Sequence, residues 1–198
     1  RLRRNTRMVT AFFWDPDKPA AIWQAFERFH DLSIVTNNIT ALNDLLKTDS
    51  RVYLLGGEVT STDAHTLFSS PENPNTFTNH VFVSKAFTSI SGIDLQAGLT
   101  VHSIVSTHIY RNLPSMAGPG LDADCHKFGQ IAMYPVADLD AFQYLIADDV
   151  PEEYRTILHQ NHTEILLNST GKVYGNTAQL KLRRFAEIMR YCLMNTVV

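Results

Sequence analysis

Short apolar runs and helical periods alternate along most of the chain. Six runs have the length and composition of buried strands: residues 9–14, 32–35, 51–55, 81–87, 142–146 and 163–167. Four segments have apolar residues at helical spacing: residues 20–29, 39–46, 101–113 and 151–159. Strands that alternate with helices form mostly parallel sheets with helices on both faces. The pattern therefore predicts an α/β fold built on such a sheet.

Some segments fall outside this alternation. Residues 60–79 are rich in Ser, Thr, Asn and Pro and predict a long loop with a short helix, and residues 114–129 predict a second loop. Residues 177–195 predict an amphipathic helix with a basic face. We therefore expect a linker, one domain and a C-terminal extension: residues 1–8, 9–168 and 169–198.

Small and polar residues follow four of the predicted strands. They form the segments Asp15-Pro16-Asp17-Lys18, Thr36-Asn37-Asn38, Gly56-Gly57-Glu58 and Ser91-Gly92-Ile93-Asp94. The carboxyl ends of parallel strands share one edge of the sheet, where open α/β proteins bind ligands. We therefore expect these loops to meet around a single crevice for a small molecule.

The residue types in these loops indicate the chemistry. Thr36-Asn37-Asn38 precedes a predicted helix and could hold phosphate on free backbone N–H groups, or simply cap the helix. Gly56 and Gly57 allow close approach of a ligand or of another backbone. Glu58 could accept sugar hydroxyls or be a solvated acid, and Asp94 could serve the site or cap a turn. Lys127 could pair with a phosphate or lie on the surface.

Composition and charge narrow the class of protein. The chain has 198 residues, of which 44% are hydrophobic, enough for one globular domain with a full core. The net charge of -3 predicts no nucleic-acid binding by this chain itself. Cys125 and Cys192 match no metal or redox spacing, and His159 and His162 have no third ligand nearby, so we predict no metal and no cofactor. Without an apolar run of membrane length or a signal peptide, the cytoplasm is the expected compartment.

Five groups of residues, in this order, resemble the C-terminal effector-binding domain of DeoR-type bacterial transcriptional repressors. They are Ile34–Asn38, Leu54–Val59, Lys85–Phe87 with Ser91–Asp94 and Gly98–Thr100, Ala123–Gly129, and Leu139–Asp140 leading to Leu145–Asp148. The resemblance covers about residues 9–167. The chain does not begin with Met, so we expect a fragment that starts in the linker of such a repressor.

The resemblance implies a domain similar to ribose-5-phosphate isomerase and the CoA-transferase group. Such domains bind a phosphorylated sugar, form homo-oligomers (dimers or tetramers), and control operator binding by a winged helix-turn-helix that would precede residue 1. The effector-binding residues that it implies are Thr36, Asn37, Asn38, Gly56, Gly57, Glu58, Gly92, Asp94 and Lys127. Further candidates are Asp17, Lys18, Lys85 and Arg111.

Some segments depart from the family pattern. The first loop is Trp14–Pro19 instead of a Gly-Thr-Thr type, and its carboxylates would repel a phosphate, with Lys18 as a partial offset. The helix after Thr100 keeps only Arg111 of the usual charged residues, and residues 116–121 lack the usual apolar character. Two alternatives stay open. One is a sugar-phosphate isomerase that uses Asp94, Glu58 and Lys127. The other is a ligand-free assembly module with the helix at residues 177–195 as its contact.

Overall fold

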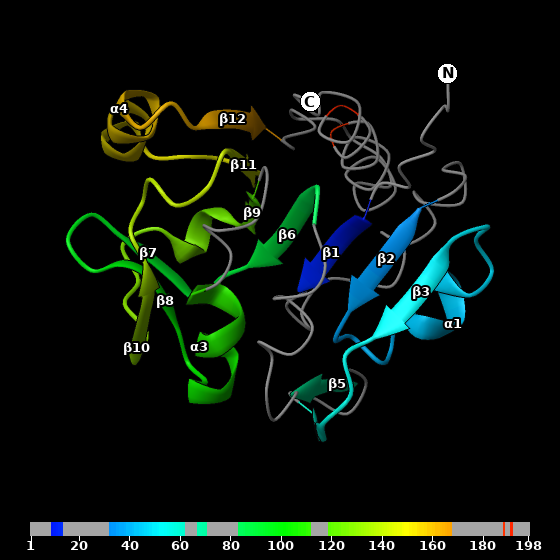
Figure 1. Ribbon diagram of the computed structural model, residues 1–198. Helices are drawn as coiled ribbons and strands as arrows, with labels where there is room; N and C mark the ends of the chain where they lie inside the picture. Colours follow the sequence, from blue (N-terminus) through cyan, green and yellow to red (C-terminus); the bar gives the residue numbers. More distant parts are fainter. Residues whose placement is uncertain are drawn as a thin grey trace, which may run out of the picture.

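A seven-stranded parallel sheet forms the centre of the protein (Figure 1). The computed structural model describes residues 9–13, 32–61, 67–70, 83–111, 119–167, 188 and 191. Across these residues the strand order is β12-β11-β9-β6-β1-β2-β3. The strands are β1 Val9–Phe13, β2 Ser33–Thr36, β3 Arg51–Leu54, β6 Lys85–Ser89, β9 Pro119–Ala123, β11 Tyr144–Ala147 and β12 Glu164–Leu167. The predicted α/β fold with a mostly parallel sheet is confirmed.

Two smaller antiparallel sheets accompany the main one. A three-stranded sheet contains β7 Gly92–Asp94, β8 Gly98–Val101 and β10 Tyr134–Ala137, and a hairpin contains β4 Glu58–Ser61 and β5 Leu67–Ser70. The helices are α1 Leu42–Leu45, α3 Ile104–Arg111, η3 Cys125–Lys127 and α4 Glu152–Gln160. None of the helices in the described ranges is long and apolar enough to cross a membrane.

A hydrophobic core cluster lies between the main sheet, the three-stranded sheet and α4. Leu121 of β9 and Leu145 of β11 pair in register, and both side chains are fully buried. They pack with Ile93 of β7, Val101 of β8 and Leu158 of α4. Because side chains alternate along a strand, this core covers one face of β9 and β11. Helices on both faces of the sheet remain a prediction.

The strand order reverses next to β1. From β1 the chain adds β2 and β3 on one side, then returns to place β6 on the other side and continues outward to β12. The carboxyl ends of β1 and β6 therefore mark a topological switch point, where the connections on the two sides diverge. Ligands of open α/β sheets bind at such points.

The prediction of a loop over residues 114–129 is wrong in part, because β9 is a central strand of the sheet. Pro119 is its first residue, a position where proline is tolerated. Gly120 pairs with Phe87 of β6, and a Cβ atom on Gly120 would lie 2.7 Å from the Phe87 ring. The strand therefore needs glycine at this position for packing. Because glycine and proline replace apolar residues at the start of β9, the sequence lacks the apolar run that predicts a strand.

Other local predictions also fail. Part of residues 60–79 forms the β4–β5 hairpin, and Glu58 begins β4 instead of lying in a loop. Residues 98–100, expected to lead into a helix, belong to β8, and α3 starts only at Ile104. The helix expected over residues 39–46 shortens to α1. The predicted linker 1–8, helix 20–29 and C-terminal helix 177–195 lie wholly or almost wholly outside the described residues.

Candidate functional site

The carboxyl ends of β2 and β3 meet the hairpin strand β5. The Leu55 amide donates to the carbonyl of Thr36 at 2.8 Å. Ser69 of β5 is 2% exposed, and its amide donates to the Asn37 carbonyl at 2.8 Å. The Ser69 hydroxyl lies between the carbonyls of Asn37 and Leu55 and donates to both. Ser69 therefore joins the loops after β2 and β3. Sequence reasoning missed it because it lies in a stretch with no strand signal.

The loop after β2 is held by its own side chains. The Thr36 hydroxyl accepts from the Asn38 amide at 3.1 Å, and the Asn38 carbonyl oxygen Oδ1 accepts from the Ala41 amide at 3.0 Å. Short polar side chains stabilise such turns by bonding nearby backbone groups. Thr36 and Asn38 thus shape the loop. The helix that follows has only four residues, so it offers little dipole for an anion.

Asn37 differs from its two neighbours. Its side-chain oxygen Oδ1 is buried and has no hydrogen-bond partner within the described part of the chain. A Cβ atom built on nearby Gly56 would have nothing within 4 Å, so space is open there. Gly57 has a φ of 146°, which other residues rarely adopt. Glu58 follows as an exposed acid at the start of β4. We call residues 36–38 and 56–58 the β2–β3 group.

Gly92 and Asp94 serve the three-stranded sheet. A Cβ atom on Gly92 would lie 2.3 Å from the carbonyl oxygen of Gln130, so the glycine allows backbone packing. Asp94 Oδ1 accepts from the amides of Gln96 and Ala97, each at 2.8 Å. These bonds hold the pKa of the Asp94 carboxyl below its usual value of 3.8. Asp94 therefore caps the β7–β8 turn, as one of the readings from sequence had it.

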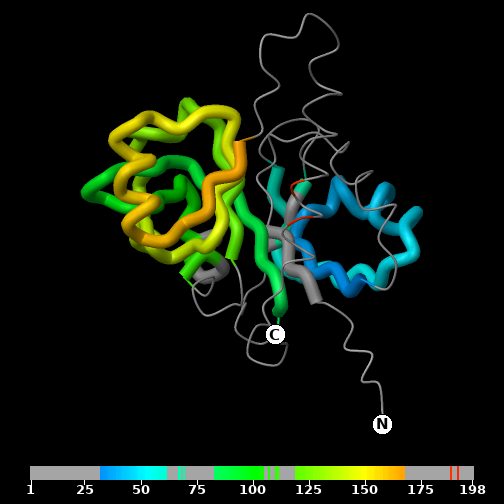
Figure 2. Tube along the Cα trace, turned by 90° about the horizontal axis from the view of Figure 1, so that it is seen from above, coloured from blue at the N-terminus to red at the C-terminus, as the bar shows by residue number. Residues whose placement is uncertain are grey.

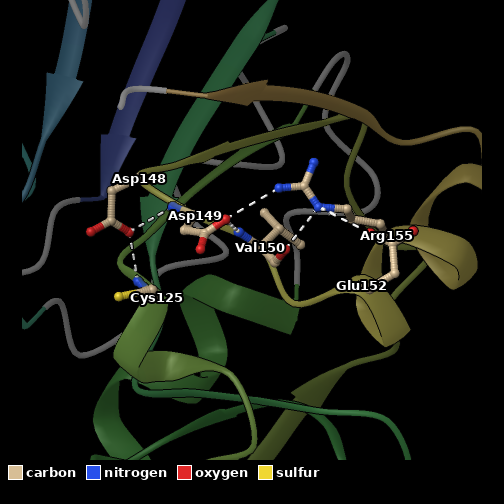
Figure 3. Close-up of polar contacts among 6 residues, drawn as sticks. All are labelled: Cys125, Asp148, Asp149, Val150, Glu152 and Arg155. Carbon is tan, nitrogen blue, oxygen red and sulfur yellow. Dashed lines mark hydrogen bonds and ion pairs between the residues drawn. The ribbon is translucent and has the colours of Figure 1, made fainter. Parts of the chain in front are cut away.

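Lys127 is the last residue of the short helix η3. The first residue of η3, Cys125, is hydrogen-bonded to Asp148 at the end of β11 (Figure 3). Asp148 Oδ1 accepts from the amides of Cys125 at 2.7 Å and of Asp149 at 3.0 Å. Burial raises the pKa of the Cys125 thiol, and the charge of Asp148 raises it further. Asp149 in turn pairs with Arg155 of α4 at 3.2 Å. Lys127, Gly92 and Asp94 are called the β6–β9 group.

The two groups lie on opposite sides of β6. In Figure 2 the blue and cyan segments, which include β2 and β3, lie on one side of the green strand β6, and the yellow-to-orange segments lie on the other side. In the sheet order, β1 separates the end of β2 from the end of β6. The structure therefore brings together the members of each group, but the two groups flank the switch point separately.

The other candidates lie away from this edge or outside the described residues. Lys85 starts β6, at the opposite end from the switch point, and is 2% exposed. Its Nζ lies 3.4 Å from the Tyr144 hydroxyl and 4.6 Å from the centre of that ring. Arg111 is exposed at the end of α3. Asp17 and Lys18 fall in the range 14–31, which is not described.

Metal binding finds no support in the described ranges. No group of three His, Cys, Asp or Glu residues there could hold an ion. His159 and His162 lie at a surface hollow beside β12 with Arg155 and Glu164, and they do not form such a group.

Comparison with known proteins identifies the family. A family model described as the DeoR C terminal sensor domain matches residues 19–149. No curated protein matches the chain. The matched range contains β2 to β11 and both groups of candidate residues. The chain belongs to the DeoR C-terminal sensor domain family, a family of ligand-sensing regulatory domains.

Proposed function

We propose that this domain binds a phosphorylated sugar at the switch point and thereby modulates operator binding by a separate DNA-binding domain. Membership of a sensor family supports a regulatory role. The residues that we propose for effector binding are those of the two groups: Thr36, Asn37, Asn38, Gly56, Gly57, Glu58, Gly92, Asp94 and Lys127. Asp17 and Lys18, which follow β1 in the sequence and lie outside the described residues, are proposed as possible additions. A repressor acts where its operator lies, so we propose that the protein works in the bacterial cytoplasm. We also propose that it forms a dimer or tetramer.

The observation that carries the proposal is the unpartnered oxygen of Asn37. It is a buried acceptor on the loop after β2, next to the strand where the sheet order reverses. A buried polar atom without a hydrogen bond costs about 1–3 kcal/mol. Proteins tolerate this cost where a ligand supplies the missing partner. A sugar hydroxyl is a donor of suitable size.

The spacing of the strands suits a ligand that spans the two groups. β1 lies between β2 and β6, and neighbouring strands are about 4.8 Å apart, so the ends of β2 and β6 are roughly 10 Å apart. Lys127 is a half-buried cation beyond the end of β9 and is a suitable partner for phosphate. We therefore expect the sugar near Asn37 and the charged end of the ligand toward β6 and β9.

The arrangement does not favour a sugar-phosphate isomerase. That reaction needs a base and an acid within reach of adjacent sugar carbons. Glu58 and Asp94 belong to different groups, and the Asp94 carboxylate already caps a turn. A regulatory domain needs only binding.

Thermal unfolding with a panel of ligands tests the proposal. The panel contains ribose 5-phosphate, glucose 6-phosphate, fructose 1-phosphate, their free sugars and inorganic phosphate. A ligand that binds only the folded state stabilises it by about 2.7 kcal/mol at a hundredfold excess over Kd. We expect one class of sugar phosphate to raise the Tm, and Lys127→Ala to reduce the shift. A panel that leaves Tm unchanged contradicts the proposal.

A further inference from the structure

The backbone amides of residues 38–41, in the loop after β2, already donate hydrogen bonds within the protein. The Asn38 amide bonds Thr36 and the Ala41 amide bonds Asn38, as described above. The remaining two, of Ile39 and Thr40, both donate to the carbonyl oxygen of Leu67 in β5, at 2.9 and 3.3 Å. A phosphate bound at this loop would need free N–H groups. From Asn38 to Ala41 the loop has none to offer while the hairpin is in place.

A buried acceptor, which has no partner among the described residues, lies at this loop. Asn37 Oδ1 is buried without a partner in the described ranges, and the loop itself carries no cationic side chain. Phosphate oxygens are acceptors and carry negative charge, so they would meet this oxygen unfavourably. A sugar hydroxyl donates a hydrogen bond and would satisfy it. The chemistry therefore matches the polyol part of a ligand.

We propose that the end of β2 is the hydroxyl subsite of the effector site, with Asn37 Oδ1 as its acceptor and Ser69 as the residue that positions it. This inference rests on the proposed function, and it assigns the phosphate to another part of the site. The sequence predicted phosphate at Thr36-Asn37-Asn38, because these residues precede a helix, and the sugar at Glu58, so the present inference revises that assignment.

The β4–β5 hairpin fixes the position of Asn37. Ser69 holds the Asn37 carbonyl with both its amide and its hydroxyl. The Thr40 hydroxyl accepts from the Leu67 amide at 2.7 Å, so a second pair of bonds holds the loop to the same strand. Ser69 is buried and does not depend on the ligand for its partners. It acts on the ligand only through Asn37 and Leu55.

Two substitutions at Asn37 separate a hydroxyl subsite from a phosphate subsite. Asn37→Asp keeps an acceptor oxygen and adds a negative charge, whereas Asn37→Leu removes the acceptor and keeps the size. The affinities of the panel sugar phosphates and of inorganic phosphate are measured by calorimetry for each folded variant. Urea unfolding of each variant checks that the fold persists.

A hydroxyl subsite predicts that the sugar phosphate which stabilises the wild type binds Asn37→Asp within about fivefold of its wild-type Kd. Asn37→Leu should bind it about tenfold more weakly, the effect of one lost hydrogen bond. The affinity for inorganic phosphate should stay unchanged in both variants. If Asn37→Asp weakens sugar phosphate and inorganic phosphate more than Asn37→Leu does, the loop binds phosphate and the inference is overturned.

The positioning role of Ser69 has its own readout. Ser69→Ala should weaken the same sugar phosphate about threefold to tenfold without changing the affinity for inorganic phosphate, and Ser69→Thr, which keeps the hydroxyl, should restore it. Equal losses for both ligands would instead indicate general loosening of the site and contradict the role. If no sugar phosphate binds the wild type, the proposed function fails and the subsite fails with it. Binding that Asn37→Leu leaves intact overturns the subsite alone.

Discussion

The glycine at position 120, which has no side chain, determines how β9 packs against β6 in the middle of the sheet. Gly120 lies beside Phe87, whose ring is fully buried, and a Cβ atom at Gly120 would come within 2.7 Å of that ring. Because the buried ring would have to shift against its neighbours in the core, Gly120→Ala should lower the free energy of unfolding by about 1–3 kcal/mol. Urea unfolding measures this change. Gly56→Ala is the matched control, because nothing lies within 4 Å of its built Cβ. Equal effects of the two substitutions would contradict this account.

The turn carboxylate Asp94 predicts a pH dependence. Its pKa is held below 3.8 by bonds from the Ala97 and Gln96 amides, so the charged form favours the folded state. This contribution is fully present above the unfolded pKa and is lost as the pH falls through the lower, folded pKa. Asp94→Asn should therefore flatten the decline of Tm below about pH 4. Thermal unfolding across the acid range measures this. Asp140→Asn, at an exposed position, is the control and should follow the wild type.

The residues of the candidate site show what a sequence reveals at this scale. Asn37 and Gly57 lie beyond the carboxyl ends of β2 and β3, at the edge of the sheet where the sequence predicted them. At Gly92 the close neighbour of the glycine is the protein's own backbone at Gln130. A glycine reports that something comes close, but the sequence alone does not tell whether it is a ligand or the chain itself. Ser69 gave no signal, because its partners are main-chain carbonyls.

At the scale of elements, Asp148 joins the ends of β9 and β11 (Figure 3). Burial raises the pKa of the Cys125 thiol, and the Asp148 carboxylate raises it further. Asp148→Asn keeps an acceptor and removes the charge, so the thiol should react about twofold to tenfold faster with iodoacetamide at pH 8. Mass spectrometry of the labelled peptides distinguishes Cys125 from Cys192. Asp149→Asn is the control, because that carboxylate pairs with Arg155 at 3.2 Å. An unchanged rate in Asp148→Asn would show that the charge of Asp148 does not contribute to the raised pKa of the Cys125 thiol.

Elements with regular patterns were predictable, and elements made by tertiary contact were not. The runs at β2, β6 and β11 are fully buried and read directly as strands. The strand β9 was missed because proline and glycine open it, and its place between β6 and β11 overrides local propensity. The hairpin β4–β5 was missed because it gains its partners from the loop after β2, more than twenty residues away in the chain. Neither the pairing of β9 nor the contacts of the hairpin produce a periodic pattern of apolar residues in the sequence.

At the scale of the whole molecule, the sheet divides into two halves around β1 and β6. The half with β2 and β3 carries a buried acceptor and open space at Gly56. The half with β9 and β11 carries a half-buried lysine on a turn that is fastened to the next strand. The order of strands could not be read from alternation alone, yet it is this order that separates the two groups. A ligand with a polyol end and an anionic end matches the separation.

The charge of the whole chain predicts that it needs another domain to bind an operator. With a net charge of -3, this chain should bind duplex DNA with a Kd above about 10⁻⁴ M at 150 mM salt, which is the weak limit for non-specific binding. Fluorescence anisotropy with a labelled duplex at 50 and 150 mM salt measures this. Arg1, Arg3, Arg4 and Arg7 are the exception to test, because they form a basic cluster in the expected linker. If the chain binds with a steep salt dependence and a variant without residues 1–8 does not, the cluster contacts phosphates and is part of the DNA-binding surface. If neither binds, this chain carries no DNA-binding surface of its own, as the proposed function with a separate DNA-binding domain requires.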